Sequence, residues 1–175
     1  MNICEFKITN IKISFVLKSS INNFKIKFKK NIYKKYYKKH NYILRGIFGV
    51  ATILGAKYNH VNITGIKILK QVPKSVKIFC KTFEININEI QNAKIDCISI
   101  TSNAPAGLKF KILKSTAKVK YEIINPPKFP GIIFKKYKSP TLIYFNSGKI
   151  NLIGSKTISE IKINLLNFFD FLKKI

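Results

Sequence analysis

The chain has 175 residues, about the length of one domain, with 33 lysine and arginine residues against 7 acidic ones and a formal charge of +26. With 46% hydrophobic residues it can bury a core, which excludes a wholly disordered chain. Lysine, isoleucine and asparagine make up 81 of the residues, and all three have AT-rich codons, so part of the charge reflects the genome. The charge still favours a polyanion as the partner.

The cysteines and the apolar segments indicate which classes of protein can be excluded. Cys4, Cys80 and Cys97 are widely spaced and form no CxxC, which argues against a disulfide framework or a zinc ribbon. The first ten residues lack the apolar region of a secretory signal. The most apolar stretch, residues 43–56, is too short to span a bilayer and contains Arg45, so we expect a buried element there.

Few side chains could carry catalysis. The seven acidic residues are scattered, the two histidines lie in no metal-binding motif, and no glycine-rich phosphate loop is present. We therefore predict a protein that is not an enzyme, with no catalytic residues, no metal and no cofactor.

In chain order, residues 5–16 and 85–101 are predicted strands, with the clearest alternation at 85–88 and 98–100. Residues 25–39 interleave eight lysines with aromatic residues. This pattern is typical of a solvated helix face, and the alternatives are a phosphate-tracking patch or a nuclear import signal.

Loops or turns are expected at residues 103–107 and at the proline-rich 125–131. From 132 to 155 the pattern predicts two or three short strands. Between them, residues 146–149 form a tight turn in which Gly148 supplies a positive φ.

Two segments have helical spacing. Residues 156–174 place apolar residues three or four apart, and Thr157 with Glu160 can form a capping box at the helix start. Residues 69–83 have the same spacing but contain Pro73, so this helix either kinks at the proline or starts there.

An internal repeat links these segments. Residues 52–67 match residues 141–156 at a constant offset of 89, and a helical segment follows each window. The identical pairs are Thr52/Thr141, Asn62/Asn151, Gly65/Gly154 and Lys67/Lys156. The repeat predicts two related halves, 1–84 and 85–175, each a curved antiparallel sheet with a helix behind it.

The second half carries a recognisable series of motifs. Phe129-Pro130-Gly131 is followed by the segment 145–149 (FNSGK), then by Gly154-Ser155-Lys156 and the predicted helix. This order resembles the second repeat of the TATA-box-binding protein core, and the similarity extends back to residues 90–92. Good coverage is roughly 86–175, whereas the first half matches mainly by position.

The resemblance implies an α+β fold of two pseudo-symmetric repeats, which form a saddle-shaped curved antiparallel sheet with helices on the convex side. In this family, whose mechanism is a known case of minor-groove binding, the concave sheet enters the groove and phenylalanine wedges kink the duplex. The implied protein is a nuclear general transcription initiation factor that binds and bends A/T-rich promoter DNA and nucleates preinitiation complex assembly. Its implied partners are double-stranded DNA, other general transcription factors and the RNA polymerase machinery, with no membrane and no small-molecule substrate.

Site residues follow from the same resemblance. Asn10 and Asn92 match the family's paired central asparagines, whose amides can donate to the acceptors of A·T pairs. Phe129 and Phe145 match wedge positions. The other implied DNA-binding residues are Thr64, Lys67, Lys135, Lys138, Ile143, Lys149, Ile153 and Lys156.

The first half departs from the family at the wedges. Their counterparts fall near residues 40–42 and at Ala56, so the expected phenylalanines are missing, with Phe48 or Tyr58 as possible substitutes.

Other departures affect the sheet face and the partner surface. Lys12 and Lys94 stand where the family has small apolar residues, and residues 125–128 replace acidic residues that in the family help to hold a partner factor. Two alternatives therefore stay open: a non-specific architectural DNA-binding protein, and a basic RNA-binding component of a ribonucleoprotein.

Overall fold

The computed structural model describes residues 5–19, 32–38, 41–54, 59–105, 122–124, 128–135 and 139–174. The chain divides into two compact units, one of residues 1–9 and 97–175 (unit 1) and one of residues 10–96 (unit 2). The long strands β1 (Phe6–Leu17) and β6 (Ile90–Asn103) each contribute residues to both units. The division into repeats at residues 84 and 85 stays a prediction, and the compact units are bounded differently.

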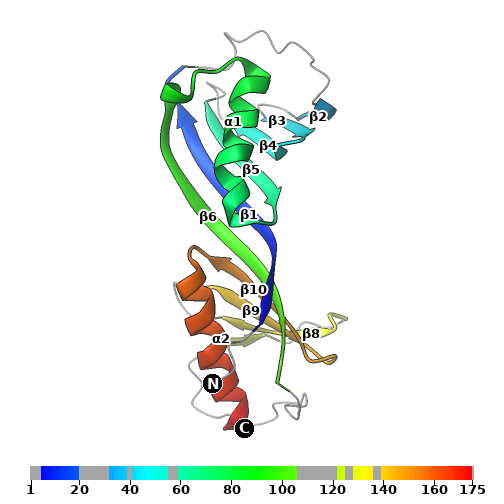
Figure 1. Cartoon of the computed structure of the whole chain (residues 1–175). Helices are drawn as coiled ribbons and strands as arrows, with labels where there is room; N and C mark the ends of the chain where they lie inside the picture. The colour runs from blue at the N-terminus through cyan, green and yellow to red at the C-terminus, as the bar shows by residue number, and fades with distance from the viewer. Residues whose placement is uncertain are drawn as a thin grey trace. The chain divides into compact units, whose positions relative to one another are not determined.

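Unit 2 is an antiparallel sheet covered on one face by a helix (Figure 1). Its strand order is β2 (Ile32–Lys38), β3 (Asn41–Gly46), β4 (Gly49–Leu54), β5 (His60–Ile66) and then β1. Helix α1 (Val72–Phe83) lies along the face to which the buried side chains of β1 point.

The core of unit 2 is aromatic. Alternate residues of β1 are buried, among them Phe15, whose ring lies 5.6 Å edge-on from Phe79 of α1. Phe48 and Phe83 pack on the same Phe79 ring. Cys80 is also buried, and this burial raises the pKa of its thiol, so it is packed as a small apolar residue.

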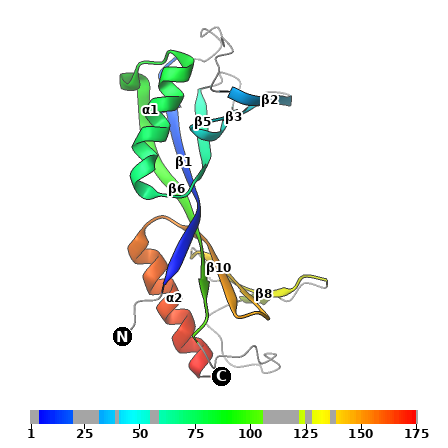
Figure 2. The same ribbon diagram turned by 45° about the vertical axis from the view of Figure 1, so that its right-hand side comes forward.

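Unit 1 repeats this plan (Figure 2). Its strands follow in the order β6, β10 (Lys149–Ser155), β9 (Thr141–Phe145), β8 (Gly131–Lys135) and β7 (Glu122–Ile124), with helix α2 (Ile158–Lys173) over one face. The core centres on Phe168 of α2, which stacks edge-on against Phe134 at 5.0 Å and Tyr144 at 5.8 Å. Of the two or three short strands predicted between residues 132 and 155, the structure has three.

Both helices begin where local chemistry favours it. Thr157 caps α2, because its Oγ1 accepts a hydrogen bond from the Glu160 N–H at 3.1 Å. The Glu160 carboxylate accepts in turn from the N–H of Lys156, one residue ahead of the cap. Helix α1 begins at Val72 and carries Pro73 in its first turn, so of the two alternatives left open by the sequence the structure shows a start at the proline and not a kink.

The predicted strand at residues 85–88 is wrong. Glu84 ends α1 in the left-handed conformation, and the Ile85 N–H donates back to the Cys80 carbonyl. The Asn86 side chain then accepts from the Asn88 N–H and starts a 3₁₀ turn, so β6 begins only at Ile90. The alternation of apolar and polar residues at 85–88 does not produce a strand, because the end of α1 and the turn formed by the Asn86 side chain determine the backbone there.

A solvated helix at residues 25–39 is also wrong where the structure describes this segment, because residues 32–38 pair with β3 as strand β2. Residues 25–31 and 39 lie outside the described residues.

The apolar stretch 43–56 supplies the β3–β4 hairpin, as expected of a buried element. In the described part of the chain no helix has the length and apolar character to cross a bilayer.

The repeat is visible in a shared bulge. In unit 2, Ile11 faces Ile66 and Ile13 faces Ile63, so β5 contains one extra residue at Gly65. In unit 1, β10 contains an extra residue at Gly154, because Ser99 faces Ile153 while Ile98 faces Ser155. Both glycines have positive φ, +88° and +105°.

This register also relates single residues of β1 and β6. Ile11 and Ile98 hold equivalent places beside the bulge, so Cys97 precedes Ile98 as Asn10 precedes Ile11, and the match of Asn10 and Asn92 to the family's asparagine pair stays a prediction. The buried residues Ile98 and Ile100 fix this register, because a slip of one residue would turn them out of the core.

Candidate nucleic-acid interface

Each sheet has one face covered by its helix and one open face, and those predicted DNA-binding residues that the structure describes lie on or beside the open faces. In unit 1 the open face carries an aromatic pair. Phe129, in the turn before β8, and Phe145, at the end of β9, have ring centroids 6.0 Å apart and are tilted by 53°. Phe129 is 38% exposed. The structure therefore brings the two predicted wedge residues together at the surface.

Gly131 allows this close approach. It faces Phe145 across the β8–β9 ladder, and a Cβ at this position would lie 3.1 Å from both the Phe145 ring and the Ile143 side chain. A larger residue would therefore push the ring away from the sheet. This gives the glycine of the Phe-Pro-Gly motif a physical role.

Apolar residues surround the aromatic pair, and exposed lysines of unit 1, which we call the basic margin, lie beyond them. Ile143 is half-buried, and Ile153 is 42% exposed on the neighbouring strand. Lysines that are exposed in unit 1 include Lys135, Lys149 and Lys156. The predicted Lys138 lies outside the described residues.

The open face of unit 2 is polar. Asn10 Oδ1 accepts a hydrogen bond from the Gly65 N–H at 2.6 Å. This bond holds the carbonyl end of the amide toward the protein, so its NH₂ end can donate to a ligand. Thr64 is half-buried and its hydroxyl lies 3.4 Å from the Val50 carbonyl oxygen, while Lys67 is exposed just beyond β5.

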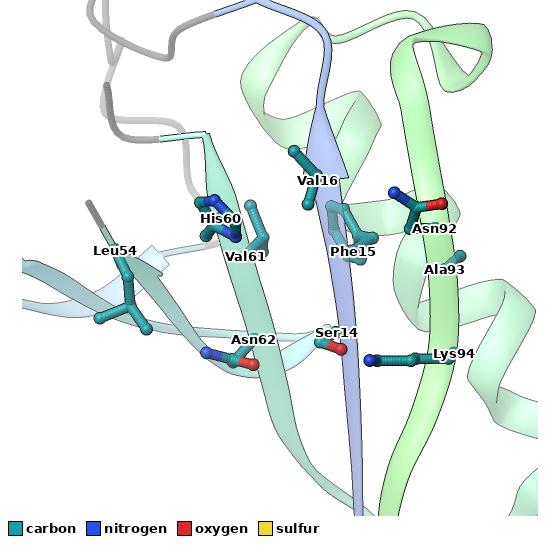
Figure 3. A pocket seen from close by; sticks show the side chains of 10 residues that line it. All are labelled: Ser14, Phe15, Val16, Leu54, His60, Val61, Asn62, Asn92, Ala93 and Lys94. Atoms are coloured by element: carbon teal, nitrogen blue, oxygen red, sulfur yellow. The ribbon is translucent and has the colours of Figure 1, made fainter. Parts of the chain in front are cut away.

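A hollow of about 680 Å³ opens on this face (Figure 3). Strands β1, β4, β5 and β6 line it, with Val16, Leu54, His60, Asn62, Asn92 and Lys94 among the lining residues. Asn92 is exposed and adopts a left-handed φ of +53°, which asparagine tolerates better than most residues. The predicted Asn92 is thus placed beside a hollow rather than at the register position of Asn10.

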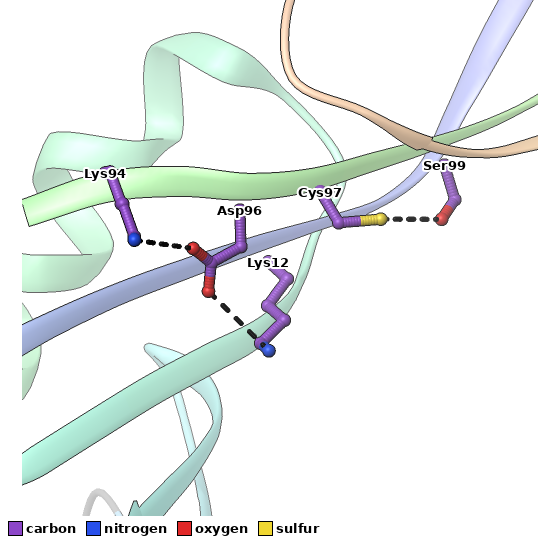
Figure 4. A network of polar contacts seen from close by, with 5 residues as sticks. All are labelled: Lys12, Lys94, Asp96, Cys97 and Ser99. Atoms are coloured by element: carbon purple, nitrogen blue, oxygen red, sulfur yellow. Dashed lines mark hydrogen bonds and ion pairs between the residues drawn. The ribbon is translucent and has the colours of Figure 1, made fainter. Parts of the chain in front are cut away.

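The two unexpected lysines converge on one carboxylate (Figure 4). Lys12 Nζ lies 3.6 Å from Asp96 Oδ2, and Lys94 Nζ lies 3.9 Å from Asp96 Oδ1. The Asp96 side chain is 24% exposed and that of Lys12 is 40% exposed. We call these three residues the Asp96 cluster. Lys12 is far from the other two in sequence, and sequence reasoning missed Asp96 because no local spacing marks it.

One proposed wedge substitute is excluded. Phe48 is only 1% exposed and packs on Phe79 and Phe83 in the core, so it cannot enter a groove. Residues 40 and 56 and Tyr58 lie outside the described residues.

In the part of the chain that the structure describes, no three histidine, cysteine or acidic side chains form a group that could hold a metal ion.

Comparisons with known proteins agree with this geometry. The family model for "Transcription factor TFIID (or TATA-binding protein, TBP)" matches residues 92–175. A solved structure titled "Methanococcus jannaschii TBP" superposes with a TM-score of 0.73, covering 98% of this chain and 99% of the other at 19% identity. The fold is thus that of a TATA-binding protein. The second half of the chain is thus similar to the TATA-box-binding protein family, and the whole chain shares that protein's fold.

The curated relatives are distant. TATA-box-binding protein 2 of Entamoeba histolytica is 29% identical over 94 residues, which cover 53% of this chain and 44% of the relative. The TATA-box-binding protein of Sulfurisphaera tokodaii is 27% identical over 127 residues, 71% of this chain and 64% of the relative. The chain therefore matches less than two thirds of the length of these relatives.

Proposed function

We propose that this protein is a transcription initiation factor that binds A/T-rich promoter DNA through the minor groove and bends it. In this role it would nucleate preinitiation complex assembly together with other general transcription factors and RNA polymerase, in the nucleus. It would bind DNA without catalysing a reaction. The similarity to the TATA-box-binding protein family and the shared fold support the DNA-binding role, and the bending rests on the geometry of unit 1.

The observation that carries the proposal is the Phe129–Phe145 pair at the surface, in which Phe129 is exposed and Phe145 is half-buried. Two phenylalanine rings on an open sheet face leave apolar surface in water, which is unfavourable unless a partner covers it. Apolar wedges that enter a minor groove unstack a base step at a cost of a few kcal/mol and bend the duplex onto more protein surface. The basic margin of unit 1 suits the phosphates on either side of such a groove.

The decisive experiment measures bending rather than affinity. A duplex labelled at both ends reports its bend angle by FRET, on TATA and G·C sequences over a salt series. We expect a bend that is confined to the TATA duplex and survives increasing salt. Binding without a bend, lost steeply with salt on both duplexes, would contradict the proposal, because a chain of charge +26 binds any DNA at low salt.

A double variant tests the wedges. Replacing Phe129 and Phe145 by alanine should reduce the bend more than it reduces non-specific affinity. The matched control replaces Ile163 and Leu166, two exposed apolar residues of α2 in the same unit, and should leave the bend unchanged. Equal losses of bend and of affinity in the phenylalanine variant would remove the wedge assignment.

A second candidate function has one observation in its favour. The Asp96 cluster makes the open face of unit 2 ionic, which suits a non-specific architectural DNA-binding protein better than a reader of A·T pairs. An affinity ratio near one between the TATA and G·C duplexes would select this function. A preference for structured RNA would instead select the ribonucleoprotein alternative.

A further inference from the structure

The Asp96 cluster places a carboxylate on a face proposed to bind DNA. Lys12 lies on the open side of β1, because its neighbours Ile11 and Ile13 are buried on the other side. Asp96 contacts Lys12, so its carboxylate lies on the open side as well, where Figure 4 shows it between the two lysines. An acidic group here would repel phosphates if it stood alone.

The two lysines offset that repulsion. The cluster has a net charge of +1, so the carboxylate can approach a polyanion without a net unfavourable charge. Both nitrogen–oxygen distances, 3.6 and 3.9 Å, are longer than hydrogen bonds. A carboxylate offers about four lone-pair positions, so Asp96 keeps capacity to accept hydrogen bonds from a ligand.

The chemistry of the minor groove then specifies the ligand. A·T pairs present only acceptors in this groove, whereas a G·C pair adds one donor, the 2-amino group of guanine. Lysine side chains can donate to the acceptors, but a carboxylate can only accept. A carboxylate held between two lysines therefore complements a G·C pair and not an A·T pair.

We propose that Asp96 accepts a hydrogen bond from the guanine 2-amino group, so that unit 2 favours a G·C pair at one position of the bound site. Lys12 and Lys94 are positioning residues that hold the carboxylate and offset its charge. The register supports a role limited to one unit, because the counterpart of Lys12 in unit 1 is Ser99. This inference rests on the proposed function and specifies which bases that function reads.

Inosine provides the test. An inosine·cytosine pair has the same minor-groove acceptors as G·C but lacks the 2-amino group. An A/T-rich duplex is prepared with each base pair replaced in turn by G·C or by inosine·cytosine, and both dissociation constants are measured at one salt concentration. We expect one position at which G·C binds about tenfold more tightly than inosine·cytosine, as for a hydrogen bond to a charged acceptor.

Variants then assign the effect to Asp96. Asp96→Ala should bring the ratio to one at that position, whereas Asp96→Asn, whose side-chain carbonyl still accepts, should retain part of it. Asp170→Ala is the matched control, because Asp170 is also paired with a lysine, Lys173 at 3.6 Å, but lies on helix α2. It changes the net charge equally and should leave the ratio unchanged.

The outcomes separate this inference from the proposed function. If the A/T-rich duplex is bent but G·C never binds more tightly than inosine·cytosine, the reading by Asp96 is wrong and the minor-groove function stands. A ratio that Asp96→Ala leaves unchanged also overturns it. If no duplex is bent and no preference for A/T-rich DNA is found, the proposed function fails and the inference fails with it.

Discussion

Gly49, at the start of β4, is a residue whose place allows no side chain. Its φ is +106°, and a Cβ built there would lie 2.3 Å from the carbonyl oxygen of Thr64 on the paired strand. Gly148 also has a positive φ, +81°, but a Cβ there would meet nothing within 4 Å. A substitution at Gly148 would therefore introduce backbone strain alone, whereas one at Gly49 would introduce the same strain and a steric clash.

We predict that Gly49→Ala destabilises the protein considerably more than Gly148→Ala. The second variant should cost only the left-handed strain, about 1–2 kcal/mol, whereas the first must also move β4 from β5. Urea unfolding of both variants measures the difference. Equal losses of unfolding free energy would show that the β4–β5 contact relaxes without cost.

Residue types alone do not decide the roles of the asparagines. In sequence, Asn10 and Asn92 are two similar residues near the middle of predicted strands. In the structure, Asn10 is fixed by the Gly65 N–H, while Asn92 lies beside a hollow with a left-handed backbone. The difference arises because strand register depends on which residues reach the core, and that is settled between strands.

At the scale of elements, the start of α2 depends on one hydroxyl. Thr157 Oγ1 satisfies the Glu160 N–H, which would otherwise have no partner within the helix. We predict that Thr157→Ala lowers the unfolding free energy by about 1 kcal/mol. Thr157→Ser retains the hydroxyl and should restore most of the loss in the same denaturant titration. A serine variant as unstable as the alanine variant would rule out the cap as the cause.

Elements were predictable from sequence where their signals are local. The cap at Thr157 acts within three residues, so the sequence pattern sufficed there, whereas at Pro73 it left a kink and a helix start as alternatives. Strand β2 was not predicted, because its lysine-rich segment becomes a strand only by pairing with β3. Pairing between segments overrides weak local preferences.

At the scale of the whole molecule, each unit has its own aromatic core. Phe79 centres the core of unit 2, and Phe168 centres that of unit 1. Replacing either by alanine should cost about 3–5 kcal/mol.

We expect the losses to be local, which hydrogen exchange with mass spectrometry can map. Phe79→Ala should accelerate exchange mainly in residues 10–96, and Phe168→Ala mainly in residues 97–175. Strands β1 and β6 contribute residues to both units. If unfolding of one unit affects the other, exchange should first accelerate at the amides of these two strands. Equal acceleration throughout the chain in both variants would mean that the two units unfold together.

The sequence by itself indicated the offset repeat, the two helices, the capped start of α2, the three strands between residues 131 and 155 and the resemblance to a family, because these depend on residues close together in the chain. It also placed Phe129 and Phe145 as candidates, through the glycine and turn motifs beside them. Only the tertiary structure decided that Phe48 is a core residue, that Cys97 holds the register position of Asn10, and that Lys12 and Lys94 meet at Asp96. Each of these depends on packing or pairing between distant segments, where burial of apolar side chains selects one register among several that the sequence pattern allows.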